Sequence, residues 1–255
     1  MFRKIILLSI LVFSIASFGA IEKIELRKGW RFEREEFDES KSQEVIKFRS
    51  GALLKALKGD YSAALELDWT KCGYDDSKWR EVTVPHDWGI EKPFDSSRKY
   101  GDAFLDVTGA GRYRLEFLAP ESWRGKTVYF ECDGAMSYAM AYVNGSFKGG
   151  WPYGYTRWRI DMTKSLEYGK TNTLAISCVN IPDSSRWYTG GGLYRRVRFL
   201  ICPEDHVLPG SVHITTSDIT GKSAKVHIRY EMSMSGFKEK SFTVKNPRLW
   251  DIDDP

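Results

Sequence analysis

The chain has 255 residues, which is enough for one large domain or two small ones. Hydrophobic residues make up 42% and charged residues 28%, and these values exclude wholesale disorder. Lys and Arg number 38 against 34 Asp and Glu, so the chain offers no basic stripe for nucleic acid or for anionic lipid. We therefore expect neither nucleic acid nor a membrane as a partner.

The N-terminus has the pattern of a secretory signal peptide. A positive start at residues 3–4 precedes an apolar, uncharged run over residues 5–18, which is too short to span a membrane. Ser17 and Gly19 provide the small residues that cleavage after Gly19 requires. The pattern predicts a signal peptide over residues 1–19 and a mature chain that is periplasmic or secreted.

Residues 33–67 interrupt the strand pattern around them. The polar first part, residues 33–42, is predicted to be a surface loop. Residues 50–67 have helical composition, and their apolar residues recur at roughly helical spacing: Leu53, Leu54, Leu57 and Ala64. We expect an insertion that contains one short helix.

From residue 111 onward, apolar and polar residues alternate in the manner of strands. Tyr113, Leu115 and Phe117 share one face of the first of these strands. A later strand runs into Asn144-Gly145, the dipeptide that favours a type I′ hairpin turn. Strands recur at intervals of roughly ten to twenty residues, which predicts an all-β antiparallel sandwich. The residues expected to be buried in it include Leu174, Ile176, Val197 and Phe199.

The most informative segment is the loop that begins at Asn180 and ends near Leu193. Three consecutive glycines, residues 190–192, allow positive φ and a close approach of the backbone to a ligand or another strand. Before them stand a carboxylate, a guanidinium and two aromatic rings, a combination of side chains that is suited to sugar binding: Asp183, Arg186, Trp187 and Tyr188. The alternative is a packed turn whose arginine is held by a neighbouring carboxylate.

Residues 203–209 are predicted to form a linker to a short second region. Val212 and Ile214 indicate one strand there, and the alternation of Val226, Ile228 and Tyr230 indicates another. About 50 residues follow the linker, which is half of what an immunoglobulin-like sandwich uses. We expect an incomplete segment with open edges and an exposed apolar face.

The sequence shows no centre for catalysis or metal binding. The acid pairs at residues 75–76 and 253–254 lie in turn contexts, and His86 is a lone histidine that is best explained as a packed, hydrogen-bonded residue. The four cysteines have no C-x-x-C pair, and we expect free, buried thiols, although spacing leaves their pairing open: Cys72, Cys132, Cys178 and Cys202. The prediction is therefore no catalytic residue, no metal and no cofactor.

A series of short motifs stands in the order found in one enzyme family. The run SSRWYTGGGLYR, residues 184–195, resembles a signature of the N-terminal sugar-binding domain of family 2 glycoside hydrolases, the β-galactosidase and β-glucuronidase family. Seven more motifs of that domain precede it: WRF (30–32), DDSKW (75–79), VPHDW (84–88), GRYR (111–114), YVNG (142–145), GYT (154–156) and DMT (161–163). NPRLW, residues 246–250, resembles a motif of the family's immunoglobulin-like second domain.

The resemblance implies a jelly-roll β-sandwich over residues 20–202 and a partial immunoglobulin-like domain over residues 203–255. It also implies that the two catalytic glutamates belong to a TIM barrel that is missing here, so that the chain alone should be inactive. By motif position, residues 183–188 are the best candidates for contacting the sugar and Asp87 is a weaker candidate, with a turn cap as the alternative for Asp87. Arg112 stands where relatives often have an aromatic residue, so one edge of the pocket should differ.

Three interpretations remain open. The chain is the N-terminal, non-catalytic region of a secreted family 2 glycosidase, truncated before the barrel, which binds a β-glycoside weakly and packs against that barrel. Alternatively, it is an autonomous carbohydrate-binding module, or the inert product of a truncated gene. The short second region and the stop at Pro255 favour the first or the third. The sequence leaves the identity of the sugar open.

Overall fold

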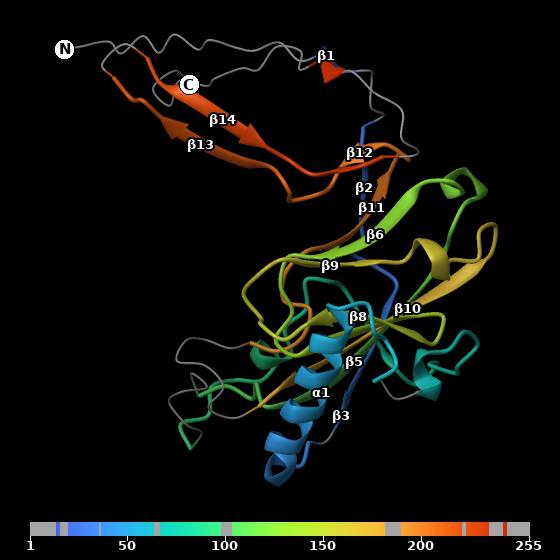
Figure 1. Cartoon of the computed structure of the whole chain (residues 1–255). Helices are drawn as coiled ribbons and strands as arrows, with labels where there is room; N and C mark the ends of the chain where they lie inside the picture. The colour runs from blue at the N-terminus through green and yellow to red at the C-terminus, as the bar shows by residue number, and fades with distance from the viewer. Residues whose placement is uncertain are drawn as a thin grey trace. The chain divides into compact units, whose positions relative to one another are not determined.

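The computed structural model describes residues 20–35, 37–63, 67–97, 104–181, 190–220 and 223–234, with the backbone of residues 14–15 and 242–243. The chain divides into two compact units (Figure 1). One unit comprises residues 22–201 and is here called the sandwich unit. The other comprises residues 1–21 and 202–255 and is called the tail unit.

One sheet of the sandwich unit has six antiparallel strands in the order β4-β3-β5-β10-β7-β8. Its centre is the pair β5 and β10, which are in register from Thr171 opposite Leu118 to Asn180 opposite Gly109. The strands are β3 (Trp30–Glu35), β4 (Arg80–Val82), β5 (Gly109–Leu118), β7 (Ala139–Val143), β8 (Ser146–Trp151) and β10 (Thr171–Asn180).

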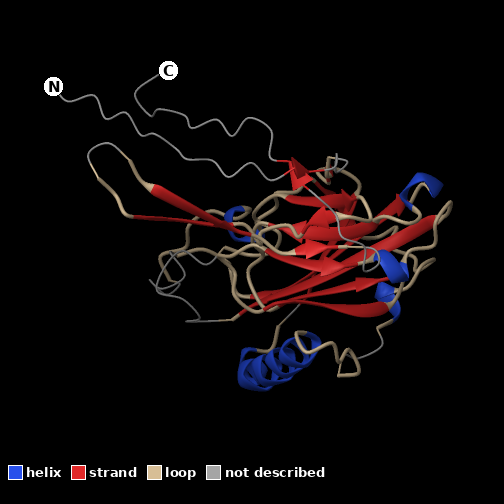
Figure 2. Cartoon of the chain, turned by 45° about the horizontal axis from the view of Figure 1, so that its top comes forward, coloured by secondary structure: helices blue, strands red, loops and turns tan. Residues whose placement is uncertain are grey.

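The second sheet has four strands in the order β2-β11-β6-β9, and it packs against the first to form the sandwich (Figure 2). The strands are β2 (Glu22–Glu25), β6 (Thr127–Cys132), β9 (Trp158–Asp161) and β11 (Val197–Cys202). Inward side chains from both sheets form one apolar core. The four residues predicted to be buried, Leu174, Ile176, Val197 and Phe199, are at most 2% exposed. The predicted all-β sandwich is therefore confirmed.

The hairpin between β7 and β8 confirms the predicted turn. Val143 pairs with Ser146, so only Asn144 and Gly145 form the loop, with φ of 50° and 84°. Two positive φ values in succession define the type I′ turn. The Asn144 amide also donates to Ser165 O and to Asn172 Oδ1, both at 2.8 Å, which fixes the hairpin to its neighbours.

The helix of the expected insertion lies earlier than predicted. Strand β3 continues through Glu35, the 3₁₀ turn η1 spans Glu39–Lys41, and α1 spans Ser42–Ala56, where the sequence predicted a loop followed by a helix over residues 50–67. The chain leaves the helix at Gly59, which has φ of +81° and acts as a C-terminal stop. The start was missed because the helix buries few residues, namely Ala52, Leu53 and Ala56.

Helix α1 covers the outer face of the six-stranded sheet (Figure 2). Strand β7 is buried along its whole length, because Ala139, Ala141 and Val143 face the core while Met140 and Tyr142 face the helix cluster. Arg49 of α1 also donates from Nη1 to Tyr138 O and Ser177 Oγ, both at 3.0 Å. The remaining short elements are η2 (Asp68–Thr70), η3 (Trp88–Ile90), η5 (Glu121–Trp123) and η6 (Thr163–Ser165).

Three of the four cysteines are buried as expected: Cys132, Cys178 and Cys202. Burial raises the pKa of Cys178 to about 12, so its thiol stays protonated. Cys72 corrects the expectation because it is exposed, and its Sγ lies 3.2 Å from Asn144 Oδ1. Neither Cys132 nor Cys178 takes part in a disulfide, in agreement with the prediction of free thiols.

The described residues of the tail unit form three short antiparallel pairs. Strand β13 (His213–Ser217) pairs with β14 (Lys225–Arg229), which confirms the two strands predicted there. Strand β12 (His206–Val207) pairs with β15 (Met232–Ser233), and β1 (Ser14–Ile15) pairs with β16 (Phe242–Thr243). No helix in the described parts of the chain is long and apolar enough to cross a membrane.

Candidate functional site

Two motifs that lie far apart in the sequence meet in the sandwich unit. Asp87, which precedes η3, accepts hydrogen bonds at Oδ1 from Gly89 N and Gly191 N, both at 2.8 Å. The Trp88 amide donates in turn to Gly191 O at 3.2 Å. The segment that carries His86, Asp87 and Trp88 is therefore bonded directly to the glycines of residues 190–192, here called the glycine turn.

The glycine turn tolerates no side chain at its centre. A Cβ on Gly191 would lie 2.2 Å from the Trp88 indole, and one on Gly192 would lie 1.9 Å from Tyr113 Oη. Gly190 and Gly192 have φ of +62° and +92°, a region that strongly favours glycine. Both expected reasons for the glycines, positive φ and close approach of the backbone, are confirmed.

The two ends of the loop are fixed side by side. The buried Asn180 side chain, at the end of β10, donates from Nδ2 to Gly190 O at 2.7 Å. Met136 and Gly192 exchange two backbone hydrogen bonds of 2.9 Å. Trp88 is fully buried beneath the turn, and its Nε1 donates to Val107 O at 2.9 Å. The loop thus begins and ends on a buried, hydrogen-bonded base.

Of the residues predicted to contact a sugar, only Asp87 lies in the described part of the chain. Asp183, Arg186, Trp187 and Tyr188 fall in residues 182–189, outside the described residues. The Oδ1 atom of Asp87 caps η3 and accepts a hydrogen bond from Gly191 N, which matches the turn-cap alternative. Trp88 is fully buried in the core.

His86 is the centre of a hydrogen-bonded chain beneath the same turn. Its Nδ1 lies 2.7 Å from Tyr113 Oη, and its Nε2 lies 2.9 Å from Glu91 Oε1. Arg80 donates to both Glu91 oxygens, at 2.7 and 2.9 Å. Burial lowers the pKa of His86 and outweighs the opposing hydrogen bond and charge of Glu91. The expectation that His86 is a packed, hydrogen-bonded residue is confirmed.

A polar pocket that sequence reasoning missed is lined by residues that include Arg34, Lys92 and Asp106. It has a volume of about 390 Å³, within the size range of small-molecule sites. Arg34 forms a bidentate pair with Asp106 at 2.9 and 3.0 Å, and its guanidinium lies 5.9 Å from the Trp88 ring. Lys92 also bonds Asp106, at 2.7 Å. No local pattern could reveal this pocket, because Arg34 and Asp106 are 72 residues apart.

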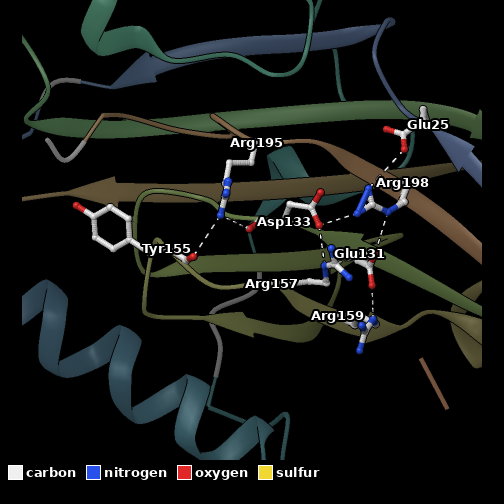
Figure 3. Close-up of polar contacts among 8 residues, drawn as sticks. All are labelled: Glu25, Glu131, Asp133, Tyr155, Arg157, Arg159, Arg195 and Arg198. Atoms are coloured by element: carbon white, nitrogen blue, oxygen red, sulfur yellow. Dashed lines mark hydrogen bonds and ion pairs between the residues drawn. The ribbon is translucent and has the colours of Figure 1, made fainter. Parts of the chain in front are cut away.

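An ion network covers part of the four-stranded sheet (Figure 3). Glu131 is 3% exposed and accepts from Arg198 Nε at 2.8 Å and from Arg159 Nε. Asp133 accepts from Arg157 and Arg198 at 2.7 and 2.6 Å. Burial opposes these bonds to Asp133, but the two arginines outweigh it and lower the pKa of its carboxyl. Asp133 is therefore held in the ionised form by neighbouring cations.

Seven described carboxyl groups have a pKa below the ordinary value: Asp38, Asp60, Asp68, Asp75, Glu91, Glu121 and Asp133. A general acid for glycoside hydrolysis needs a raised pKa so that it is protonated at neutral pH, and none of these seven groups has one. Nor do the described residues gather three His, Cys, Asp or Glu side chains that could hold a metal ion.

Comparisons with known proteins identify the class to which this sandwich belongs. No family model matches the chain. The β-galactosidase BoGH2A of Bacteroides ovatus is 30% identical over 220 residues, which cover 72% of this chain and 26% of that enzyme. A crystal structure of a β-glycosidase from Bacteroides vulgatus superposes with a TM-score of 0.66 at 27% identity, covering 85% of this chain and 25% of its own. The chain is thus a β-sandwich region of the glycoside hydrolase class.

The family follows from a second solved structure. A family 2 glycosyl hydrolase from Bacteroides cellulosilyticus superposes with a TM-score of 0.64 at 26% identity, covering 82% of this chain and 24% of its own. The chain belongs to glycoside hydrolase family 2, as its motif order indicated. It spans about a quarter of the length of each of these three relatives.

Proposed function

We propose that the chain is the non-catalytic N-terminal region of an exported family 2 β-glycosidase. In this role the glycine turn presents Asp183, Arg186, Trp187 and Tyr188 to one wall of a sugar pocket, and a catalytic barrel supplies the rest. The observation that carries the proposal is the hydrogen-bonded base of the loop, formed by Asp87, Trp88 and Asn180. A preorganised base reduces the ordering cost that a binding loop would otherwise pay.

The proposed division of labour follows from chemistry. Hydrolysis with retention requires two carboxyl groups about 5 Å apart, one of them protonated. Asp133 of the described sandwich is instead held by arginines, and Asp75 by a turn N–H group. The chain therefore orients the sugar and excludes water from it, while the proton donor and the nucleophile come from the barrel.

Sugar binding by the purified chain tests the proposal. We expect dissociation constants of about millimolar for simple β-glycosides, because a few hydrogen bonds and one stacking surface are all that this wall offers. Titration of the chain with methyl β-galactoside and methyl β-glucuronide, followed by NMR, measures these constants and compares the two sugars.

Arg186→Ala tests the loop itself. We expect this variant to lose the detectable binding while its urea unfolding curve stays that of the parent. Arg124→Ala is the matched control, since Arg124 is exposed, pairs with Glu121 of the neighbouring 3₁₀ turn and lies over the Tyr168 ring, and it should bind as the parent does. If Arg186→Ala unfolds the chain instead, the arginine is a structural tie and the packed-turn alternative holds.

Activity measurements separate the remaining interpretations. The chain alone should not hydrolyse nitrophenyl β-galactoside or β-glucuronide, whereas a family 2 barrel that lacks its own sandwich should gain activity when the chain is added. Micromolar sugar binding without any effect on a barrel would instead identify an autonomous module. The absence of both binding and stimulation would identify an inert product.

The proposed export rests on residues 1–19. Expression of the whole coding sequence in a Gram-negative host, followed by N-terminal sequencing of the periplasmic protein, tests it. We expect the mature chain to begin at Ala20, and recovery of the uncleaved chain in the cytoplasm would contradict the proposal.

A further inference from the structure

A further pocket of the sandwich unit lies beside the pairing of β2 with β11, and the function proposed above does not use it. Its volume is about 370 Å³, within the size range of small-molecule sites. Apolar residues form one part of its lining, and two arginines with one glutamate form the other: Val84, Pro85, Val197, Arg27, Arg196 and Glu25. All six residues belong to the described part of the chain.

The two arginines of this pocket stand opposite each other on neighbouring strands. Strands β2 and β11 are antiparallel, and Leu26 N donates to Val197 O at 3.0 Å just beyond the end of β2. One residue further along each chain segment, the same register brings Arg27 opposite Arg196. Residues directly opposite each other in antiparallel strands have Cβ atoms about 4.5–5.5 Å apart. Two positive side chains therefore start from neighbouring backbone positions and line one pocket.

This arginine pair has no counter-charge bound to it. Among the described residues, neither guanidinium has a hydrogen bond, an ion pair or a ring contact. The adjacent pair on the same strands shows the difference, because Glu25 and Arg198 form an ion pair of 3.4 Å there (Figure 3). Like charges directly opposite each other destabilise a sheet, whereas opposite charges stabilise it. The arginine pair therefore keeps its N–H donors available for an anion.

The size of the repulsion fits an exchangeable ligand better than a permanent structural ion. Both arginines are exposed, so water and salt screen much of their repulsion and the empty pair is tolerated. An anion that enters the pocket removes the remaining repulsion and accepts charge-assisted hydrogen bonds from both guanidinium groups. Binding is then favourable without being required for the fold.

We propose that this pocket binds a small organic carboxylate, with Arg27 and Arg196 donating to its two oxygens. The planar guanidinium group matches the geometry of a carboxylate. Two arginines against Glu25 leave the pocket with a single net positive charge, which suits a monoanion. The apolar lining at Val84 and Pro85 favours an acid with an apolar body over an inorganic ion.

Titration with cyclohexanecarboxylate at pH 7 and fixed ionic strength tests the proposal. The Nε–H signals of Arg27 and Arg196 in 1H–15N spectra should shift together, with a dissociation constant of about millimolar. Arg27→Gln and Arg196→Gln should each weaken binding about tenfold, since each removes one charge-assisted hydrogen bond. Both residues are exposed, so the urea unfolding curves of these variants should stay close to that of the parent.

A matched control separates the pocket from the general field of the surface. Lys23→Gln removes a positive charge from the exposed side of the same strand, outside the pocket lining, and should bind as the parent does. An equal loss in Lys23→Gln would overturn the proposal, because binding would then follow overall charge.

Two further ligands test the chemistry of the site. Cyclohexanecarboxamide has the same apolar body without the charge and should bind at least tenfold more weakly than the acid. Sulfate should also bind more weakly, because it lacks the apolar body. Equal affinity for the amide would reduce the site to an apolar groove, and equal affinity for sulfate would reduce it to adventitious anion binding. Either result, or the absence of any shift at the two arginines, would contradict a carboxylate site.

Discussion

The sandwich unit and the tail unit contain similar strand-forming residues, and they bury them to very different extents. Ile176 and Phe199 of the sandwich are at most 2% exposed, whereas Ile214 and Ile228 of the tail are 63% and 56% exposed. Both pairs lie in strands with regular antiparallel register. The difference is that the sandwich strands have a second sheet to pack against and the β13–β14 ribbon is only two strands wide.

The comparison shows that alternation of apolar residues predicts strands but does not predict burial. A two-stranded ribbon is marginally stable by itself, because each apolar side chain keeps most of its contact with water. We therefore expect the sandwich unit to provide nearly all of the cooperative unfolding signal. Substitutions in the sandwich unit should therefore lower the free energy of unfolding more than similar substitutions in the tail unit.

The largest effect is expected in the ion network of the sandwich. Glu131→Ala removes the buried carboxylate that Arg198 and Arg159 share, and breaking this buried network by removing one partner should cost about 3–5 kcal/mol. Urea unfolding followed by tryptophan fluorescence measures the loss. Glu121→Ala removes an exposed carboxylate paired with Arg124 and should leave the curve unchanged. Equal effects in the two variants would mean that the network adds nothing beyond a surface pair.

A smaller effect is expected at the glycine turn. Gly192→Ala places a Cβ 1.9 Å from Tyr113 Oη at φ of +92°, which should cost about 3 kcal/mol through overlap and backbone strain. Gly125 has φ of +80° but nothing within 4 Å, so Gly125→Ala should cost only about 1 kcal/mol. Both variants share the backbone strain, so the difference between their free energies of unfolding, measured by denaturation, gives the cost of steric overlap. A Gly192 variant as stable as the Gly125 variant would mean that Tyr113 can move aside.

The smallest effect compares single methylene groups in the two units. Ile176→Val removes one methylene from the core and should cost about 1 kcal/mol in the free energy of unfolding. Ile228→Val makes the same change in the exposed ribbon and should leave that free energy unchanged. A measurable loss in the Ile228 variant would show that the tail contributes to the cooperative unit.

Sequence reasoning predicted those features that depend on neighbouring residues. Alternation located β5 and β10, and Asn144-Gly145 located the β7–β8 hairpin, because each depends only on local backbone preference. The same reasoning misplaced α1, since it overlooked the stop at Gly59 and the helix has only a weak apolar stripe.

The base of the candidate site could be predicted only in part. The glycines themselves were recognised from their conformational freedom. Their partners were not, because Asp87 and Gly191 are 104 residues apart and only the folded sandwich brings them together. The same holds for His86 and Tyr113, which were separate motif members in the sequence and are one hydrogen-bonded pair in the fold.

Because the cysteines differ in exposure, their reactivity with a thiol reagent can report unfolding of the core. Cys72 is exposed and should react at once with a maleimide, whereas Cys132, Cys178 and Cys202 are buried and should react only when the core is disrupted. The mass added to each molecule therefore distinguishes native chains, with one label, from opened chains, with up to four. Pulse labelling along a denaturant gradient would follow opening of the core without any engineered probe.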